Sequence, residues 1–494
     1  MGSQRPHHPE LPLLGSVGRA VRQTKRLRDV FSVLIRNGFG DVVDVLRSGR
    51  RASLPAESAE HADGAGPPQA RPARIRRVLE ELGPTFVKLG QILSTRSDLV
   101  PPNLLEELSK LQDEVPPFPF EEVQRVVEQE FGRPLEEVFD SFDKEVLASG
   151  SLGQVHKARL GGQAVAVKVQ RPGIQGTIDT DLELMMQFAS ALERHVEGWD
   201  IHQPTRVVEE FAKTLEQELD YQVEAAHQES FRRRFASDDT VFVPAVLREA
   251  TTRRVLTMEF VNGIKVTDLE ALEAAGADPG ELARRGFQSV LRQTLGDGFF
   301  HADPHPGNIF VLPGNQVCFI DFGMMGRLSQ RVRDDFVELI YHIVNRNSPR
   351  VTATILRLTR QRTPVDSAAV ERDVAEFIDG QVGQPLEEMD VGHLLTQVLD
   401  SLARYGLRVP ADLYLMLKAI AEIESLAVRL DPDFDIVAEG GPYVRSLFVD
   451  RFRPGRMAEE LSTTARELAG VLRDAPDLLR DLSDRARTGS LTKP

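Results

Sequence analysis

Four short segments occur in a fixed order along the chain, and together they constrain its fold more than any other feature. The segment ASGSLGQV occupies 148–155, and Lys168 follows in the run VAVK. Asp303 and Asn308 lie five positions apart in HADPHPGN, and Asp321 comes thirteen residues later in Asp-Phe-Gly. Each segment alone has an ordinary structural explanation, because glycine turns are common and loop aspartates cap helices. In this order, however, they predict a nucleotide site.

The segment 148–155 has the glycine spacing of a loop that covers phosphates. Ala148 stands in the first glycine position, Gly150 in the second and Gly153 in the third. Glycines there let backbone amides approach phosphate groups closely. The other predicted nucleotide contacts around the loop and the following strands are Ser149, Ser151, Val155, Ala166, Met258, Glu259 and Val261.

The remaining motif residues carry polar groups suited to phosphoryl transfer. Lys168 would bind phosphate if a carboxylate on a nearby helix oriented it, and Glu218 is available for that role. Asp303 has the position of the residue that handles a hydroxyl proton. Asn308 and Asp321 offer the oxygen ligands that Mg²⁺ needs when it bridges nucleotide phosphates. The pattern therefore predicts a kinase-like protein that binds ATP or ADP with Mg²⁺.

The predicted fold class is α+β: a bilobal protein-kinase-like fold with a small β-rich N-lobe and a helical C-lobe. Short β-branched runs predict strands at 165–170, 241–247, 253–261 and 316–323. Helical patterns precede and follow them. The expected divisions are a basic amphipathic helical region at 1–51, a flexible linker at 52–73, a helical extension at 74–135, the N-lobe at 136–260, the C-lobe at 261–450 and a charged helical tail at 451–494.

Charge is distributed unevenly along the 494 residues. The net charge is -15, yet residues 1–51 carry ten Lys/Arg against four Asp/Glu. An acidic body argues against nucleic acid as a partner, whereas the basic arm indicates an anionic membrane surface or an acidic protein. Within 18–46, one helical stripe holds Val21, Leu27, Val30, Phe31, Leu34 and Ile35. We expect this helix to dock on the body, with a membrane-surface helix as the alternative.

No signal for secretion or membrane insertion is visible. No stretch reaches 18 uninterrupted apolar residues, and the start lacks the apolar run of a secretory signal. The single Cys318 excludes a disulfide framework. We therefore expect a cytoplasmic protein that associates peripherally with membranes; its oligomeric state is left open.

Residues 75–450 closely resemble the UbiB family of atypical kinases, also called aarF-domain kinases. The segment LGPTFVKLGQILSTRSDLVP contains the family's K-x-G-Q signature at Lys88, Gly90 and Gln91. The family's E-x-D appears as Glu218 and Asp220, followed by Tyr221 and Glu224. The resemblance implies that the helical extension lies over the active site, with Lys88, Gln91, Glu218, Asp220 and Glu224 in regulatory roles. It also implies a quinone precursor or lipid as a partner.

Two departures separate this chain from better-known patterns. Ser149 and Gly150 replace alanines that the family carries, which leaves the preference for ATP or ADP open. No A-P-E follows Asp-Phe-Gly, and Ala302 replaces the arginine that would pair with a phosphorylated activation segment. Three hypotheses remain: a UbiB-type kinase or ATPase in isoprenoid-quinone or lipid metabolism, a small-molecule phosphotransferase of the aminoglycoside or choline kinase type, and a pseudokinase scaffold. The K-x-G-Q segment disfavours the second, and the intact polar residues disfavour the third.

Overall fold

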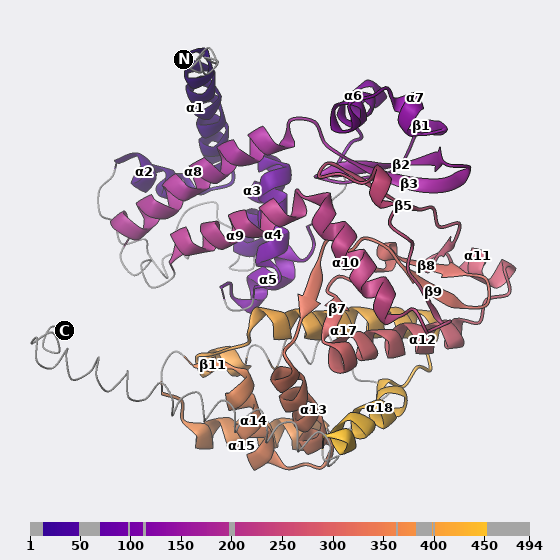
Figure 1. Ribbon diagram of the computed structural model, residues 1–494. Helices are drawn as coiled ribbons and strands as arrows, with labels where there is room; N and C mark the ends of the chain where they lie inside the picture. The colour runs from indigo at the N-terminus through magenta and orange to yellow at the C-terminus, as the bar shows by residue number, and fades with distance from the viewer. Residues whose placement is uncertain are drawn as a thin grey trace, which may run out of the picture. The chain divides into compact units, whose positions relative to one another are not determined.

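The computed structural model describes residues 13–48, 70–96, 99–111, 115–196, 203–361, 364–381, 398 and 401–451 (Figure 1). These residues form two compact units. The first comprises the described residues up to Leu328 and those within 359–365 and 389–434, and the second comprises those within 329–358, 366–388 and 435–451. Every site residue predicted above belongs to the first unit.

An antiparallel sheet forms the β-rich part of the first unit. Its strand order is β1 (Ser141–Ser149), β2 (Gly153–Leu160), β3 (Gln163–Gln170) and β5 (Val255–Glu259). In β3 the three valines of VAVKV are fully buried, and Lys168 lies between two of them in sequence. Because successive side chains of a strand point to opposite faces, one face of β3 builds a core and the other presents Lys168.

Two helices cover the valine face of this sheet. Helices α6 (Phe120–Phe131) and α7 (Leu135–Val138) contribute Val123, Val127 and Leu135 to the same buried cluster as the β3 valines. The predicted boundary at 135 placed α6 in the extension, whereas the structure packs it on the sheet. The reason is its apolar stripe, which finds its partner surface on β3.

The N-terminal helices form a second core with α8 (Ile174–His195) and α9 (Pro204–Glu218). They are α1 (Leu13–Arg36), α2 (Gly40–Ser48), α3 (Ala70–Leu82), α4 (Pro84–Leu93) and α5 (Pro102–Leu108). Val30 and Val33 of α1 are buried there, and Phe31 stacks on Phe188 at 5.8 Å between ring centroids. Arg26 donates to Asp181 of α8 at 2.6 Å. The apolar stripe of α1 is thus docked on the body through Val30, Phe31 and Leu34, as expected, whereas Ile35 is 50% exposed.

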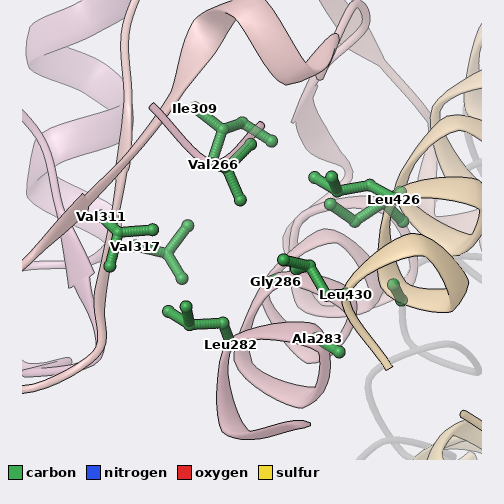
Figure 2. A pocket seen from close by; sticks show the side chains of 11 residues that line it. Val266, Leu282, Ala283, Gly286, Ile309, Val311, Val317, Leu426 and Leu430 are labelled. Atoms are coloured by element: carbon green, nitrogen blue, oxygen red, sulfur yellow. The ribbon is translucent and has the colours of Figure 1, made fainter. Parts of the chain in front are cut away.

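A second sheet and two helices build another part of the first unit. A second sheet has the order β4 (Val241–Phe242), β9 (Gln316–Phe319), β8 (Ile309–Leu312) and β6 (Ile264–Lys265). It packs on α12 (Pro279–Leu291), which in turn contacts α17 (Ala411–Leu430). Figure 2 shows side chains of these strands and helices around an apolar cavity of about 10 Å³. A space of this size and polarity is a packing void of the core.

The shorter elements of the first unit surround these sheets. They are α10 (Tyr221–Arg234), α11 (Leu269–Ala274), a π-helical turn at Arg292–Asp297, β7 (Phe299–His301) paired with β10 (Met325–Arg327), and β11 (Arg360–Gln361) paired with β12 (Leu407–Arg408). Short 3₁₀ turns occupy Arg248–Ala250 and Pro306–Asn308.

The second unit is helical, as the sequence after Arg327 predicts. It contains α13 (Gln330–Val344), α14 (Ser348–Leu358), α15 (Ser367–Gln381) and α18 (Ile436–Asp450). Glu338 of α13 accepts from Arg451 at 2.9 Å and pairs with Arg357 at 3.2 Å, which links three segments of this unit. Helix α13 starts seven residues after Gly323, so the chain passes from Asp-Phe-Gly to a helix without a long activation segment.

Several sequence predictions need correction. The strand expected at 241–247 covers only Val241–Phe242, because Pro244 lacks the N–H that a longer ladder requires. The strand expected at 316–323 ends at Phe319. The helix expected over 18–46 is two helices, interrupted at Gly38 with φ 82°. Residues 70–73 of the expected linker belong to α3, and the rest of that linker and the tail after 451 lie outside the described residues.

In the described part of the chain, no helix is both long enough and apolar enough to span a bilayer.

Candidate functional site

A cleft of about 1240 Å³ in the first unit brings the sequence motifs together. Its lining includes the 148–155 loop, Lys168, the 301–308 loop and Asp321. Residues of α4, α5, α9, α10 and α17 complete the wall. More than a hundred residues separate Lys168 from His301 in sequence, so the convergence of the first two motifs with the last two is a property of the fold.

The turn between β1 and β2 is tightly closed. The amide of Gly150 donates to the carbonyl of Gly153 at 2.8 Å. A Cβ on Gly153 would lie 2.5 Å from the carbonyl oxygen of Val169 and 2.4 Å from the Tyr221 hydroxyl, so no larger residue fits without a shift. The hydroxyls of Ser149 and Ser151 are buried and have no hydrogen-bond partner within the described residues. These hydroxyls are donors that a bound phosphate could satisfy.

Lys168 is held by two carboxylates at the centre of the cleft. Its Nζ donates to Glu224 Oε1 at 3.0 Å and Oε2 at 2.9 Å, and lies 3.7 Å from Asp321 Oδ2. Burial opposes the charge of Lys168, but Asp321 and Glu224 outweigh it and raise its pKa well above the ordinary value. In return, the Lys168 ammonium lowers the pKa of Asp321 to about 2. Lys168 and Asp321 are therefore both charged at neutral pH, whereas burial raises the pKa of Glu224 against the pull of the Lys168 ammonium.

The carboxylate that orients Lys168 is Glu224, which corrects the expectation that Glu218 does so. Glu224 lies in the first turn of α10, and the N–H of Gln222 in that turn bonds to the Asp220 side chain at 3.0 Å. This cap starts a new helix after Glu218, so the two glutamates lie on different helices. Asp220, predicted to be regulatory, is therefore an N-cap that sets where Glu224 stands.

Glu218 instead contacts the K-x-G-Q helix. Lys88 Nζ of α4 lies 2.9 Å from Glu218 Oε2 of α9, and the two side chains are only 14% and 11% exposed. Gly90 lets α4 pack closely on leucines of the N-terminal core, because a Cβ there would lie 2.2 Å from Leu111 Cδ1 and 2.8 Å from Leu79 Cδ1. Gln91 donates to the Leu111 carbonyl at 3.3 Å. Lys88 and Gln91 both line the cleft, as the resemblance implied.

The 301–308 loop fixes the main chain around Asp303. The Asp303 amide donates to His301 Nδ1 at 3.3 Å, so His301 Nε2 is the nitrogen that donates to the Ile320 carbonyl at 3.2 Å. Asn308 Nδ2 donates to the Asp303 carbonyl at 3.3 Å. Ala302 is fully buried, so no space for an arginine side chain exists there.

The Asp-Phe-Gly segment has an unusual backbone. Asp321 has φ 60°, a left-handed conformation that is uncommon outside glycine but tolerated by aspartate. Its Oδ1 accepts from the Gly323 amide at 3.1 Å, which stabilises this turn. Phe322 is fully buried against Phe231 and His301. The buried ring anchors the segment and leaves the Asp321 carboxylate 48% exposed in the cleft.

Four predicted nucleotide contacts are not among the residues that line this cleft: Ala166, Met258, Glu259 and Val261. Met258 is buried with Tyr221, Ala225 and Leu256 in a small cluster against which Ala166 packs. Glu259 accepts from the Ala245 amide at 3.2 Å through its side chain. Met258, Ala166 and Glu259 thus contact α10 or the 244–246 segment, and nucleotide contact by the four residues stays a prediction.

Comparison with known proteins agrees with this arrangement. Residues 110–355 match the ABC1 atypical kinase-like domain, and residues 374–435 match the UbiB helical domain. The chain is 35% identical over 441 residues to a probable protein kinase UbiB of Aeromonas salmonicida, covering 88% of this chain and 80% of that protein. The chain belongs to the UbiB family of atypical kinases.

Other relatives of the UbiB family differ more in length. Protein ACTIVITY OF BC1 COMPLEX KINASE 3, chloroplastic, of Arabidopsis thaliana is 38% identical over 375 residues, which are 76% of this chain and 53% of the relative. The chain therefore spans about half of that protein. The solved structure of Rv3197 with erythromycin, from Mycobacterium tuberculosis, is 26% identical with a TM-score of 0.52, covering 71% of this chain and 90% of that one. The kinase-like fold predicted from the sequence is confirmed.

The UbiB motif residues include a donor set that fits Mg²⁺. Asp321 presents a carboxylate and Asn308 an amide oxygen, and both line the cleft. These are hard oxygen ligands, and Mg²⁺ is usually held by one or two protein ligands together with substrate phosphates. Across the described residues, no group of three or more His, Cys, Asp or Glu side chains could hold a metal. When bound, the ion would neutralise charge on the phosphates.

Sequence reasoning missed the contribution of α17 to the cleft, including Lys418 and Glu422. Lys418 Nζ donates to Asp303 Oδ1 at 3.2 Å and lies 3.1 Å from Glu422 Oε1. A signal was present, because Lys418 and Glu422 are charged i,i+4 neighbours within a largely apolar helical segment. This spacing predicts that the two side chains face the protein interior, but it does not predict that Lys418 contacts Asp303.

Proposed function

We propose that this UbiB-family protein binds Mg-ATP in the cleft and acts as an atypical kinase or ATPase. The observation that carries the proposal is the ion cluster of Lys168, Glu224 and Asp321, with Asp303 in the same cleft. Lys168 would bind nucleotide phosphate, Asn308 and Asp321 would hold Mg²⁺, and Asp303 would take the proton of the attacking hydroxyl or water. The closed turn at Gly150–Gly153 would cover the phosphates.

Helix α4 supports a restraint on protein substrates. Its Lys88 is tied to Glu218 inside the cleft, so α4 occupies part of the space beside the nucleotide site. A peptide would have to displace this helix, and no long activation segment offers another platform. We therefore include autoinhibition toward proteins in the proposal, together with a smaller acceptor, water included.

A role in isoprenoid-quinone or lipid metabolism at a membrane is the biological part of the proposal. It is supported by membership of the UbiB family and by the basic N-terminal arm. The apolar face of α1 is buried in the body, so attraction to the membrane would rest on charge. A phenolic quinone precursor or a lipid is the acceptor class that this reading favours over a peptide.

Substitution of Asp321 tests the nucleotide site. Asp321→Asn removes a charge that would bind Mg²⁺ and that now balances Lys168, so it should weaken Mg-ATP binding by about 2–4 kcal/mol. The measurement is thermal stabilisation of the full chain by Mg-ATP, with Asp239→Asn as the matched control, since Asp239 is exposed and outside the cleft. Equal stabilisation of the wild type and Asp321→Asn would sink the assignment.

A further inference from the structure

The proposed roles above leave a polar stripe on α17 unexplained. Tyr414, Lys418, Glu422, Ser425 and Arg429 recur at helical spacing and all line the cleft. The opposite side of the helix is apolar, and its Leu430 faces the small core cavity in Figure 2, while Leu426 lies at the border and lines both the cavity and the cleft. The packing of the apolar side fixes the rotation of α17 and therefore directs the polar stripe at the 301–308 loop.

Lys418 is the member of the stripe that reaches the catalytic loop. The loop holds the main chain of Asp303 through His301 and Asn308, whereas the contact to its carboxylate comes from Lys418 at 3.2 Å. Glu422, one helical turn further along α17, places its Oε1 3.1 Å from Lys418 Nζ. The Oε2 atom of Glu422 is buried and has no hydrogen-bond partner within the described residues. Lys418 is thus buried between two carboxylates, with only 22% of its side chain exposed.

We propose that Lys418 is a second lysine of the reaction site, which positions the Asp303 carboxylate and supplies positive charge where the phosphoryl group is transferred. The inference rests on the proposed function. In that reaction the oxygen of water or of an acceptor hydroxyl forms a bond to the γ-phosphorus. The bond from phosphorus to the bridging oxygen breaks, its electron pair leaves with ADP, and the proton of the attacking oxygen passes to Asp303.

The position of Lys418 differs from that of Lys168 in a way that suits this task. Lys168 is bonded to Glu224 and lies near Asp321, the predicted metal ligand. Lys418 contacts Asp303, the residue that receives the proton. A fixed cation beside the point where charge develops stabilises the transition state more than the ground state. Loss of Lys418 should therefore lower turnover and leave nucleotide binding unchanged.

The test compares Lys418→Met, Lys418→Arg and the matched control Arg404→Met in the full chain. Arg404 is exposed and lies outside the cleft lining, so its substitution removes the same charge without touching the proposed site. We expect Lys418→Met to lower kcat for phosphate release from Mg-ATP roughly 100-fold, with KM changed less than about twofold. Lys418→Arg should recover part of the rate because it keeps the charge, and Arg404→Met should behave as the wild type.

A second measurement is independent of turnover. Calorimetric binding of Mg-ADP with aluminium fluoride, a mimic of the transferring phosphoryl group, is compared with binding of Mg-ADP alone. Lys418→Met should lose most of the gain that aluminium fluoride gives the wild type and keep its affinity for Mg-ADP. The inference is overturned if Lys418→Met keeps the full gain in affinity from aluminium fluoride. It is also overturned if the variant loses affinity for Mg-ADP alone as much as for Mg-ADP with aluminium fluoride. In either case Lys418 forms only a structural ion pair. A wild type that binds no Mg-ADP refutes the proposed function itself.

Discussion

Glu422 shows how one residue can couple the cleft to pH. Burial raises the pKa of Glu422 from 4.5 to about 7, with Lys418 lowering it and the Asp303 carboxylate raising it. Tyr414, on the same stripe, also faces this group. At a pH between these two pKa values, Glu422 holds a proton in the folded chain that it has released in the unfolded chain. The free energy of unfolding therefore falls as pH rises through this window and levels off above about pH 7.

We predict that Glu422→Gln removes this part of the pH dependence. The contribution should be roughly 1–3 kcal/mol between pH 5 and pH 7.5. The measurement is the Tm of both proteins across that range: the wild type should lose stability relative to Glu422→Gln as pH rises. The other titrating groups are common to both chains and cancel in the difference. Parallel Tm curves would show that Glu422 is ionised throughout.

At the scale of elements, α4 is the segment whose role depends most on one contact. The ion pair from Lys88 to Glu218 joins α4 to α9 inside the cleft. The nucleotide cluster does not need Glu218, because Lys168 is already bonded to Glu224. We therefore expect removal of Lys88 to loosen α4 and uncover the cleft without changing the partner of Lys168.

We predict that Lys88→Ala raises autophosphorylation from labelled ATP while stabilisation by Mg-ADP stays unchanged. Breaking a largely buried pair leaves the Glu218 charge uncompensated, which weakens the packing of α4. Lys110→Ala is the matched control, because Lys110 also lines the cleft but pairs with Glu107 three residues before it. If autophosphorylation rises in Lys110→Ala as well, the cause is the loss of a positive charge in the cleft and not the loss of the contact from Lys88 to Glu218. No change in phosphorylation or ATPase activity would make the signature a packing element and favour a small-molecule phosphotransferase.

At the scale of the whole molecule, the charge is separated between a basic N-terminal arm and an acidic remainder. Removing the arm would be a poor test of membrane binding, since Val30 and Val33 belong to the core. Lys25 and Arg28 of α1 are exposed and can be changed without opening that core. The structure thus separates the docking side of α1 from its charged side.

We predict that the double variant Lys25→Gln/Arg28→Gln binds anionic vesicles more weakly than the wild type. At about 1 kcal/mol for each basic residue near the surface, affinity should fall roughly thirtyfold at low salt. Co-sedimentation with phosphatidylserine vesicles measures it. The control Arg232→Gln/Arg233→Gln removes the same charge from exposed positions of α10. Equal losses in both variants would mean that net charge, and not the arm, attracts the membrane.

Much of the site could be predicted from sequence because its chemistry is local. Lys168 lies within an alternating strand, Asp303 and Asn308 share one loop, and Asp321 follows one short strand, so short-range spacing places each residue. Strands β1 and β2 were missed because β1 is mostly exposed and interrupted by register shifts, which hide the alternation that marks a strand. Nucleotide contact by Ala166, Met258, Glu259 and Val261 stays a prediction, and their absence from the cleft lining could not be read from the sequence, because burial depends on the helix that covers a strand.

The sequence by itself determined the fold class, the family and the identity of the charged residues, because strand alternation, glycine spacing and motif order are properties of neighbouring residues. Only the tertiary structure decided which charges meet. Glu224 and not Glu218 holds Lys168, because the Asp220 cap begins a new helix between them. Lys418 meets Asp303 across 115 residues, because the apolar side of α17 packs on the core and turns its polar side into the cleft. Such pairings depend on the rotation and packing of whole helices, which local patterns do not encode.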